Sequence, residues 1–372
     1  HVVIGNGSLS IDSDACHCPV PKIDTIPHHG PLFSIGMSNV TPGITRQFLS
    51  VCNSLSKTEK LKGLLIENVT IDDGVLDLSG AVSLSRIKIR QVTMSSESSF
   101  LLCSSLSQCT ELVELKFANL NLDEGQLNLS RASCLREVNL DSVNMSSDCA
   151  QLLCDSLRQC SQLETFILRH VNLGHCKLKL LLASSISILC FENVSMSNES
   201  AVLLCDNLYH CKQLMEVTLS HVNINEGKLD LSQASCLWKL SLDNINPSAG
   251  SAVFLCDRLA YYTNLWRLTL GYINLGDGKL DLSQAVRLSE LCLEHVTLSS
   301  ECAVVLMKSL SQCAELKMLQ LDDINLSDDK LGLLRASLLS SFTLQNITMS
   351  SQSIVQLFSI FSQFKKMRDV DE

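Results

Sequence analysis

The residues best suited to chemistry lie near the start of the chain, where cysteines and histidines occur close together. They are Cys16, His17, Cys18, His28 and His29. Zinc takes Cys and His ligands at short spacing. The C-x-C and H-H spacings are not those of a standard zinc finger, and the stretch is rich in Pro, Gly, Asp and Ser without periodicity. We therefore predict a flank or linker at residues 1–31 and assign it no metal.

Elsewhere the sequence shows no pattern typical of catalysis. His170, His221 and His295 recur at equivalent positions of a sequence repeat, where we expect surface residues at strand ends. The many serines include no G-x-S-x-G motif, and the pair Asp322–Asp323 fits solvated strand-end residues better than an acid/base pair. We predict a protein with no enzymatic activity and no cofactor.

A second set of residues is suited to binding without reaction. Its members are Arg86, Lys88, Arg90, Trp238, Lys239, Trp266, Arg267, Tyr272, Glu290, Glu294 and His295. The first three form a basic row flanked by Glu67 and Glu114. Aromatic residues and Arg dominate the energetics of interfaces where they are exposed.

The only two tryptophans of the chain, Trp238 and Trp266, occupy the same position of adjacent repeats. Their size makes them the best candidate anchor for a protein partner. The alternative is that they cover the edge of the core at the start of their strands. The sequence leaves both interpretations open.

A 51-residue repeat positions these candidates. One series of residues recurs at this interval: Leu61, Leu112, Leu163, Leu214, Leu265 and Leu316. A second series does the same: Leu84, Leu135, Ile186, Leu237, Leu288 and Leu339. Each unit is therefore a pair of shorter repeats of 23 and 28 residues, and both lengths are within the range of leucine-rich repeats.

Each repeat contains the pattern L-x-x-L-x-L-x-x-(V/I/L)-x-(L/M/I), which predicts one short strand. Its fourth and sixth residues, such as Leu115 and Phe117, share one face because side chains alternate along a strand. One such strand cannot bury its apolar side alone, so the repeats must stack. Pattern positions 3, 5, 7 and 8 would then form an exposed concave face that carries binding candidates.

The longer repeat continues into a predicted helix, and the shorter one does not. A serine stands at each helix start as a candidate N-cap: Ser95, Ser146, Ser197, Ser248, Ser299 and Ser350. The shorter repeat has an extended segment after a glycine turn, at Gly74, Gly125, Gly227 and Gly278. Residues 175–183 depart from this pattern, with Cys176 in place of the glycine, so we expect a local distortion or an exposed apolar contact there.

The eighteen cysteines follow the repeat and not a disulfide framework. One position holds Cys52, Cys103, Cys154, Cys205 and Cys256, and another holds Cys109, Cys160, Cys211 and Cys313. We predict buried, reduced thiols in a reducing, cytoplasmic compartment. The N-x-S/T sites at Asn68, Asn193 and Asn346 are then part of the repeat pattern and not glycosylation acceptors.

Composition limits the classes of partner that the chain is expected to bind. The net charge of -10 argues against a generic nucleic-acid binder. No apolar run is long enough for a membrane span, so we expect a soluble chain. We predict one elongated repeat domain at residues 32–366 with about 13 repeats, closed by a cap at Phe358, Phe361 and Phe364 and followed by a tail at 367–372.

The alternation of helix and L-x-x-L-x-L strand, with a QC-x-x-L step between them, resembles the leucine-rich repeats of ribonuclease inhibitor and, more closely, of NOD-like receptors. The resemblance covers residues 32–366. It implies an α/β solenoid of horseshoe shape, with a parallel sheet on the concave face and helices alternating with short extended segments on the convex face. The P-loop motif of those receptors is absent from this sequence.

The resemblance implies ligand sensing or autoinhibition in a cytosolic innate immune receptor, through a protein ligand or an intramolecular partner domain. A free-standing interaction protein is the alternative, either an inhibitor or an adaptor that recruits substrates to a ubiquitin ligase. An extracellular receptor ectodomain is a third possibility, which eighteen free thiols would exclude.

Overall fold

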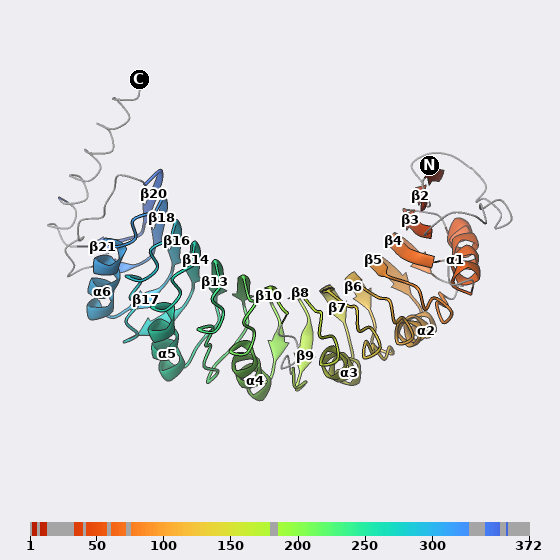
Figure 1. Cartoon of the computed structure of the whole chain (residues 1–372), viewed down its shortest axis with the longest axis horizontal. Helices are drawn as coiled ribbons and strands as arrows, with labels where there is room; N and C mark the ends of the chain where they lie inside the picture. The colour runs from red at the N-terminus through yellow and green to blue at the C-terminus, as the bar shows by residue number, and fades with distance from the viewer. Residues whose placement is uncertain are drawn as a thin grey trace, which may run out of the picture. The chain divides into compact units, whose positions relative to one another are not determined.

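The computed structural model describes residues 2–5, 8–12, 33–39, 42–57, 61–71, 76–178, 185–326, 339–349 and 355. The chain divides into two compact units, both built from strand repeats (Figure 1). The first unit comprises His1–Ile186 with Asn193–Ser197, and the second comprises Ser187–Glu192 with Asn198–Glu372.

The first unit contains a sheet whose strands follow one another in chain order. These strands are β1 (Val2–Gly5), β2 (Ser8–Asp12), β3 (Phe33–Ser38), β4 (Leu61–Ile71), β5 (Arg86–Met94), β6 (Glu114–Asn121), β7 (Glu137–Asn144) and β8 (Thr165–Arg169). The first two pair antiparallel, and each later pairing is parallel. A small parallel pair joins β9 (Asn172–Gly174) to β11 (Ser195–Met196).

The second unit contains parallel strands on the same plan. They are β10 (Ile188–Glu192), β12 (Glu216–Ser220), β13 (Lys239–Asp243), β14 (Arg267–Gly271), β16 (Glu290–Glu294), β18 (Met318–Asp322) and β20 (Ser341–Gln345). Two small parallel pairs join β15 (Asn274–Gly276) to β17 (Thr297–Leu298) and β19 (Asn325–Leu326) to β21 (Thr348–Met349). The predicted strand in each repeat is thereby confirmed.

The repeated leucines form the core, as predicted. Every member of both 51-residue series is buried, and the most exposed, Leu339, shows 9% of its surface. Along β6 the burial alternates, so that Leu115 and Phe117 are buried between half-exposed neighbours. Burial of a Leu or Phe side chain contributes about 1.5–3 kcal/mol relative to exposure. The core therefore stabilises the stack repeat by repeat.

The helices follow the strands of the longer repeats and lie together on one side of the strands within each unit (Figure 1). Their bounds are α1 (Pro42–Ser56), α2 (Ser96–Leu106) and α3 (Ser147–Leu157) in the first unit, and α4 (Asn198–Leu208), α5 (Ala249–Leu259) and α6 (Ser300–Leu310) in the second. None of the described helices is long and apolar enough to cross a membrane.

The predicted serine caps are confirmed at three helices. Ser95, Ser146 and Ser248 each accept a hydrogen bond from the backbone N–H three residues later. This satisfies a donor that the helix itself leaves unpaired. Ser299 differs, because its hydroxyl donates to Cys302 Sγ at 3.0 Å and accepts no backbone hydrogen bond.

The glycines of the shorter repeats are explained by packing. Gly125, Gly227 and Gly278 each close a turn, but they have no positive φ. A Cβ added at Gly125 would lie 2.5 Å from Cys103 Sγ, and one at Gly278 would lie 2.6 Å from Cys256 Sγ. The turns were predicted correctly. In these three repeats the packing favours glycine, because the buried thiol of the preceding helix occupies the space that a Cβ would take.

Cys176 takes the place of that glycine in one repeat of the first unit. Its thiol is hydrogen-bonded to that of Cys154, which occupies the helix position facing the glycine elsewhere. Both side chains are buried. This repeat therefore accommodates a side chain beside the helix thiol at the position where the other repeats have glycine. The expected distortion over 175–183 lies mostly outside the described residues, which stop at 178 and resume at 185.

The N-terminal stretch differs from the predicted flank. It contains the hairpin of β1 and β2, and β2 continues the sheet by parallel pairing with β3. The cysteines and histidines at 16–29 and the proposed cap at Phe358, Phe361 and Phe364 lie outside the described residues. So do Gly74 and Ser350.

The predicted burial of the repeat cysteines is confirmed. Cys52, Cys103, Cys154, Cys205 and Cys256 are buried, and so are Cys109, Cys160, Cys211 and Cys313. All are free thiols. Burial raises the pKa of Cys160 and Cys211 to about 11, so these side chains stay neutral and act as small apolar residues.

Candidate functional site

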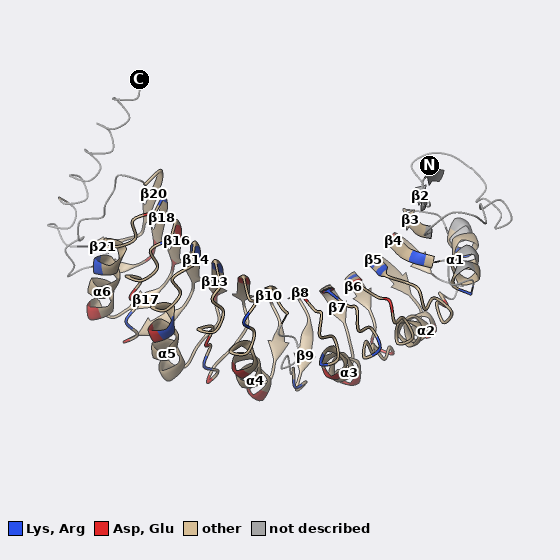
Figure 2. Ribbon diagram, in the orientation of Figure 1, with Lys and Arg blue, Asp and Glu red and all other residues tan. Residues whose placement is uncertain are grey.

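The exposed face of the first unit carries the predicted basic row on β5 (Figure 2). Arg86, Lys88 and Arg90 are exposed, and the alternating Ile87 and Ile89 are buried. Alternation along the strand therefore directs three positive charges into solvent from one strand.

The acids predicted to flank this row are in place on the neighbouring strands. Lys88 Nζ lies 2.9 Å from Glu67 Oε1 of β4, and Arg86 Nε lies 3.9 Å from Glu114 Oε2 of β6. Arg90 is exposed and makes no ion pair with any residue that the structure describes. Of the three basic residues, Arg90 is therefore the one left for an external partner.

The sequence interpretation missed two further basic residues on this face, Lys116 of β6 and Arg169 of β8. Lys116 Nζ lies between Glu114 and Glu137, at 2.7 and 2.9 Å from their carboxylates. Partial burial lowers the pKa of Lys116, but hydrogen bonds to both carboxylates outweigh it and raise the pKa above its ordinary value. Lys116 therefore remains charged.

These basic residues surround a shallow hollow of about 150 Å³ on β5 to β8. We call it the basic hollow; it is lined by Lys88, Ile89, Arg90, Lys116, Phe117, Ala118, Asn119, Asn139, Asp141 and Arg169. Ala118 stands beside Arg90 on one side and Asp141 on the other in the strand register. Its small side chain leaves the space open.

The second unit presents the two tryptophans side by side. They lie one residue before β13 and β14, and the backbone N–H of Trp266 donates to the carbonyl of Trp238 at 2.8 Å. Their ring centroids are 6.0 Å apart, and 37% of Trp266 is exposed. The predicted equivalence of the two positions is confirmed. A half-exposed pair of this kind fits both an anchor and a cover for the core edge.

Lys239 and Arg267 follow the tryptophans and are paired with acids. Lys239 Nζ lies 3.1 Å from Glu216 Oε2, and Arg267 Nη1 lies 3.2 Å from Glu290 Oε2. These four side chains are partly exposed, so each pair contributes at most about 1 kcal/mol. The start of these strands is therefore neutral overall.

The ends of the strands form a second cluster in this unit. The Tyr272 ring stacks on His295 with centroids 4.5 Å apart, and its hydroxyl lies 3.3 Å from Glu294 Oε1. His295 Nδ1 lies 2.7 Å from Asp323 Oδ2. His170, His221, Tyr272 and His295 all have φ near +50° where the chain leaves the strand. The predicted surface position at the strand end is confirmed for the histidines.

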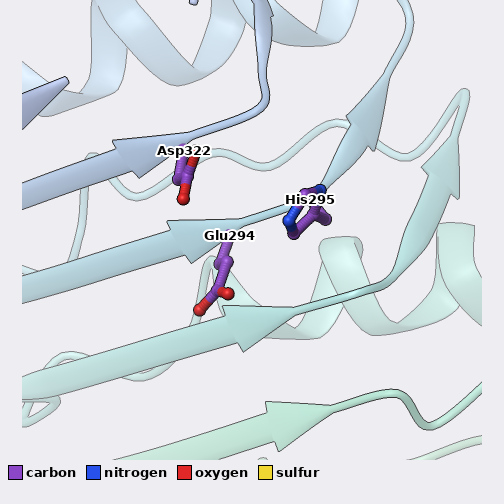
Figure 3. A group of neighbouring side chains, drawn as sticks. All are labelled: Glu294, His295 and Asp322. Atoms are coloured by element: carbon purple, nitrogen blue, oxygen red, sulfur yellow. The ribbon is translucent and has the colours of Figure 1, made fainter. Parts of the chain in front are cut away.

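Glu294, His295 and Asp322 bring three ligand atoms within 4.8 Å of one another (Figure 3). Two carboxylates and a histidine are donors that transition metals take, and the sequence search missed this group. Asp322 already accepts a hydrogen bond from Asn346. Glu294 accepts one from the Tyr272 hydroxyl, and His295 is hydrogen-bonded to Asp323. These hydrogen bonds account for the three partly exposed side chains without an ion.

The predicted candidates thus fall on two separate surfaces. Arg86, Lys88 and Arg90 belong to the first unit; Trp238, Lys239, Trp266, Arg267, Tyr272, Glu290, Glu294 and His295 belong to the second. Alignment of equivalent positions on neighbouring strands would have placed Lys116 beside Lys88 and Asp322 beside Glu294.

Comparison with known proteins identifies the fold. The structure resembles a leucine-rich repeat protein of Leptospira interrogans (TM-score 0.59, 15% identity, 88% of this chain and 87% of that one) and an internalin from Listeria monocytogenes (TM-score 0.54, 15% identity, 77% and 76%). The chain therefore has the leucine-rich repeat solenoid fold.

In sequence the chain is similar to the protein NLRC5 of Ictalurus punctatus, with 27% identity over 176 residues, which are 43% of this chain. This match spans 10% of the length of that relative. No protein-family model matches the chain.

Proposed function

We propose that this chain is the ligand-sensing and autoinhibitory leucine-rich repeat domain of a cytosolic NOD-like innate immune receptor, with no enzymatic activity of its own. The observation that carries the proposal is the sequence similarity to NLRC5, which extends over more than three of the 51-residue repeats. The QC-x-x-L step between helix and strand supports the same family.

The buried thiols support the cytosolic part of the proposal. Cys103, Cys154, Cys205 and Cys256 occupy equivalent helix positions and are free. Free thiols persist in a reducing compartment, whereas secreted proteins oxidise them to disulfides. Thiol titration of the unfolded protein purified without reductant is expected to detect all eighteen cysteines. Stoichiometric loss of thiols would favour an extracellular receptor instead.

The partner is a protein ligand or another domain of the same receptor, bound through the exposed sheet faces. The two surfaces supply what protein interfaces use: partly exposed aromatics at Trp238 and Trp266 and exposed arginine at Arg90. A membrane is not required as a partner, and nucleic acid is disfavoured by the net charge of -10.

The test is the full-length transcript of the same gene, followed by deletion of this domain. The proposal predicts an upstream nucleotide-binding domain with a G-x-x-x-x-G-K-[ST] loop. Deleting residues 32–366 from that protein should raise its basal signalling, because the inhibitory contact is lost. An F-box-like motif, or a transcript with no nucleotide-binding domain, would contradict the proposal and favour a free-standing adaptor or inhibitor.

A further inference from the structure

We propose that the basic hollow on β5 to β8 is a docking site for an acidic, carboxylate-bearing segment of a protein partner. The inference rests on the proposed role of the chain in recognising protein, but not on the identity of the receptor to which it belongs. Its occupant is an extended stretch that places an Asp or Glu side chain over Ala118.

The charge of the lining is the first argument. Four basic side chains and one carboxylate line the hollow, in a chain whose overall charge is -10. Lys88 and Lys116 are fixed by ion pairs to Glu67, Glu114 and Glu137. Such pairs hold the two ammonium groups in place without an energetic cost at the moment of binding. Arg90 presents a guanidinium that has no ion pair among the described residues, and guanidinium binds carboxylate through two parallel hydrogen bonds.

The size of the hollow is the second argument. The hollow has a volume of about 150 Å³. Pockets for small-molecule ligands measure roughly 300–1,000 Å³. The hollow therefore admits a side chain with its carboxylate and is smaller than the pockets that enclose small-molecule ligands.

The pattern of acids on the same face argues against nucleic acid. Glu67, Glu114, Glu137 and Asp141 alternate with the basic residues across β4 to β7. A nucleic acid carries a negative charge at each nucleotide along its backbone, so these carboxylates would repel it. A peptide can place one carboxylate over Arg90 and keep neutral residues opposite the acids.

The test is binding of a fluorescent peptide with a single Glu flanked by Gly residues to the whole chain, measured by anisotropy. Arg90→Ala should weaken binding about 3- to 10-fold, and Arg90→Glu should weaken it further, because interfacial charge pairs are coupled. Ala118→Leu should also weaken it, since it fills the hollow without changing the charge. Arg86→Ala is the matched control, because Arg86 lies on the same strand outside the hollow.

Three outcomes would overturn the inference. The first is no binding of the peptide up to about 1 mM. The second is an equal loss in Arg86→Ala and Arg90→Ala, which would indicate diffuse attraction. The third is tighter binding of a single-stranded DNA of the same length. None of these depends on the transcript, so the inference and the proposed receptor role can fail separately. Circular dichroism of each variant establishes that it is folded.

Discussion

β5 in the first unit and β16 in the second occupy equivalent places four 51-residue units apart, yet β5 presents three basic residues where β16 has two glutamates and a cysteine. Arg86, Lys88 and Arg90 correspond to Glu290, Cys292 and Glu294. The buried residues between them are aliphatic in both strands.

The comparison shows how a repeat separates stability from recognition. Core positions must remain apolar because each repeat buries its neighbour. Exposed positions on the same strands carry no such requirement. The first unit therefore has a basic hollow over Ala118, whereas the equivalent position in the second unit holds Asp322 beside Glu294. One backbone plan presents two faces of different chemistry.

The largest expected effect concerns what the units share, their buried thiols. Burial raises the pKa of Cys160 and Cys211 to about 11, above about 8.5 in the unfolded chain. Above that lower value the folded state holds more protons, so the free energy of unfolding falls as pH rises. Each such thiol lowers the free energy of unfolding by up to about 1.4 kcal/mol per pH unit.

Because both units contain several of these thiols, denaturant unfolding at about pH 10.5 should show a loss of several kcal/mol relative to about pH 8. Cys160→Ala and Cys211→Ala should each reduce the slope of the free energy of unfolding against pH by the contribution of up to one proton. A stability that stays constant between these pH values would contradict the assigned burial.

Phe117→Ala should sharpen the comparison by weakening only the first unit. Phe117 is 1% exposed and lies beneath the basic hollow, so its loss should cost about 3–5 kcal/mol. Hydrogen exchange should accelerate in β5 to β7 and remain unchanged in β13 to β16. Equal acceleration in both regions would show that the units do not unfold independently.

Gly278→Ala tests the packing of glycine against the helix thiol. The added Cβ would lie 2.6 Å from Cys256 Sγ and 3.0 Å from the Leu275 carbonyl oxygen, so we expect a loss of about 1–3 kcal/mol. Gly250→Ala is the control, because nothing lies within 4 Å of its added Cβ. Thermal unfolding of the two variants measures the difference. A melting temperature of Gly278→Ala equal to that of the unsubstituted chain would mean that the thiol moves aside at no cost.

The double variant Trp266→Ala, Arg267→Ala tests the aromatic surface of the second unit. If Trp266 is an anchor, the variant should weaken partner binding by more than about 1 kcal/mol and leave the melting temperature nearly unchanged. Calorimetry with the partner and thermal unfolding give the two values. A large drop in melting temperature with intact binding would assign the tryptophans to the edge of the core.

Much of the fold could be predicted because the same sequence pattern recurs in each repeat, so that one strand predicts the position of the next. The spacing of Leu61 and Leu112 gave the register, and alternation around Ile87 gave the exposed basic row. The hairpin of β1 and β2 was missed because it lies outside the repeat, although Asn6-Gly7 between the two strands is a sequence signal for a hairpin.

The candidate site was less predictable, since it depends on residues far apart in sequence. Arg90 and Arg169 line one hollow although they lie on β5 and β8. Ala118 was not singled out because its role is to be small. The preference for glycine at position 278 likewise arises from contact with Cys256 on helix α5. The preference of turns for glycine predicted the turn correctly but did not reveal this contact.

The most direct measurement is photo-crosslinking of the whole chain with a Glu/Gly peptide that carries a diazirine, with insertion sites mapped by mass spectrometry. The contrast between the two faces predicts insertions concentrated on β5 to β8 around Arg90 and Ala118, and their loss in Arg90→Glu. Insertions on β13 to β18, or an even spread over both units, would contradict it.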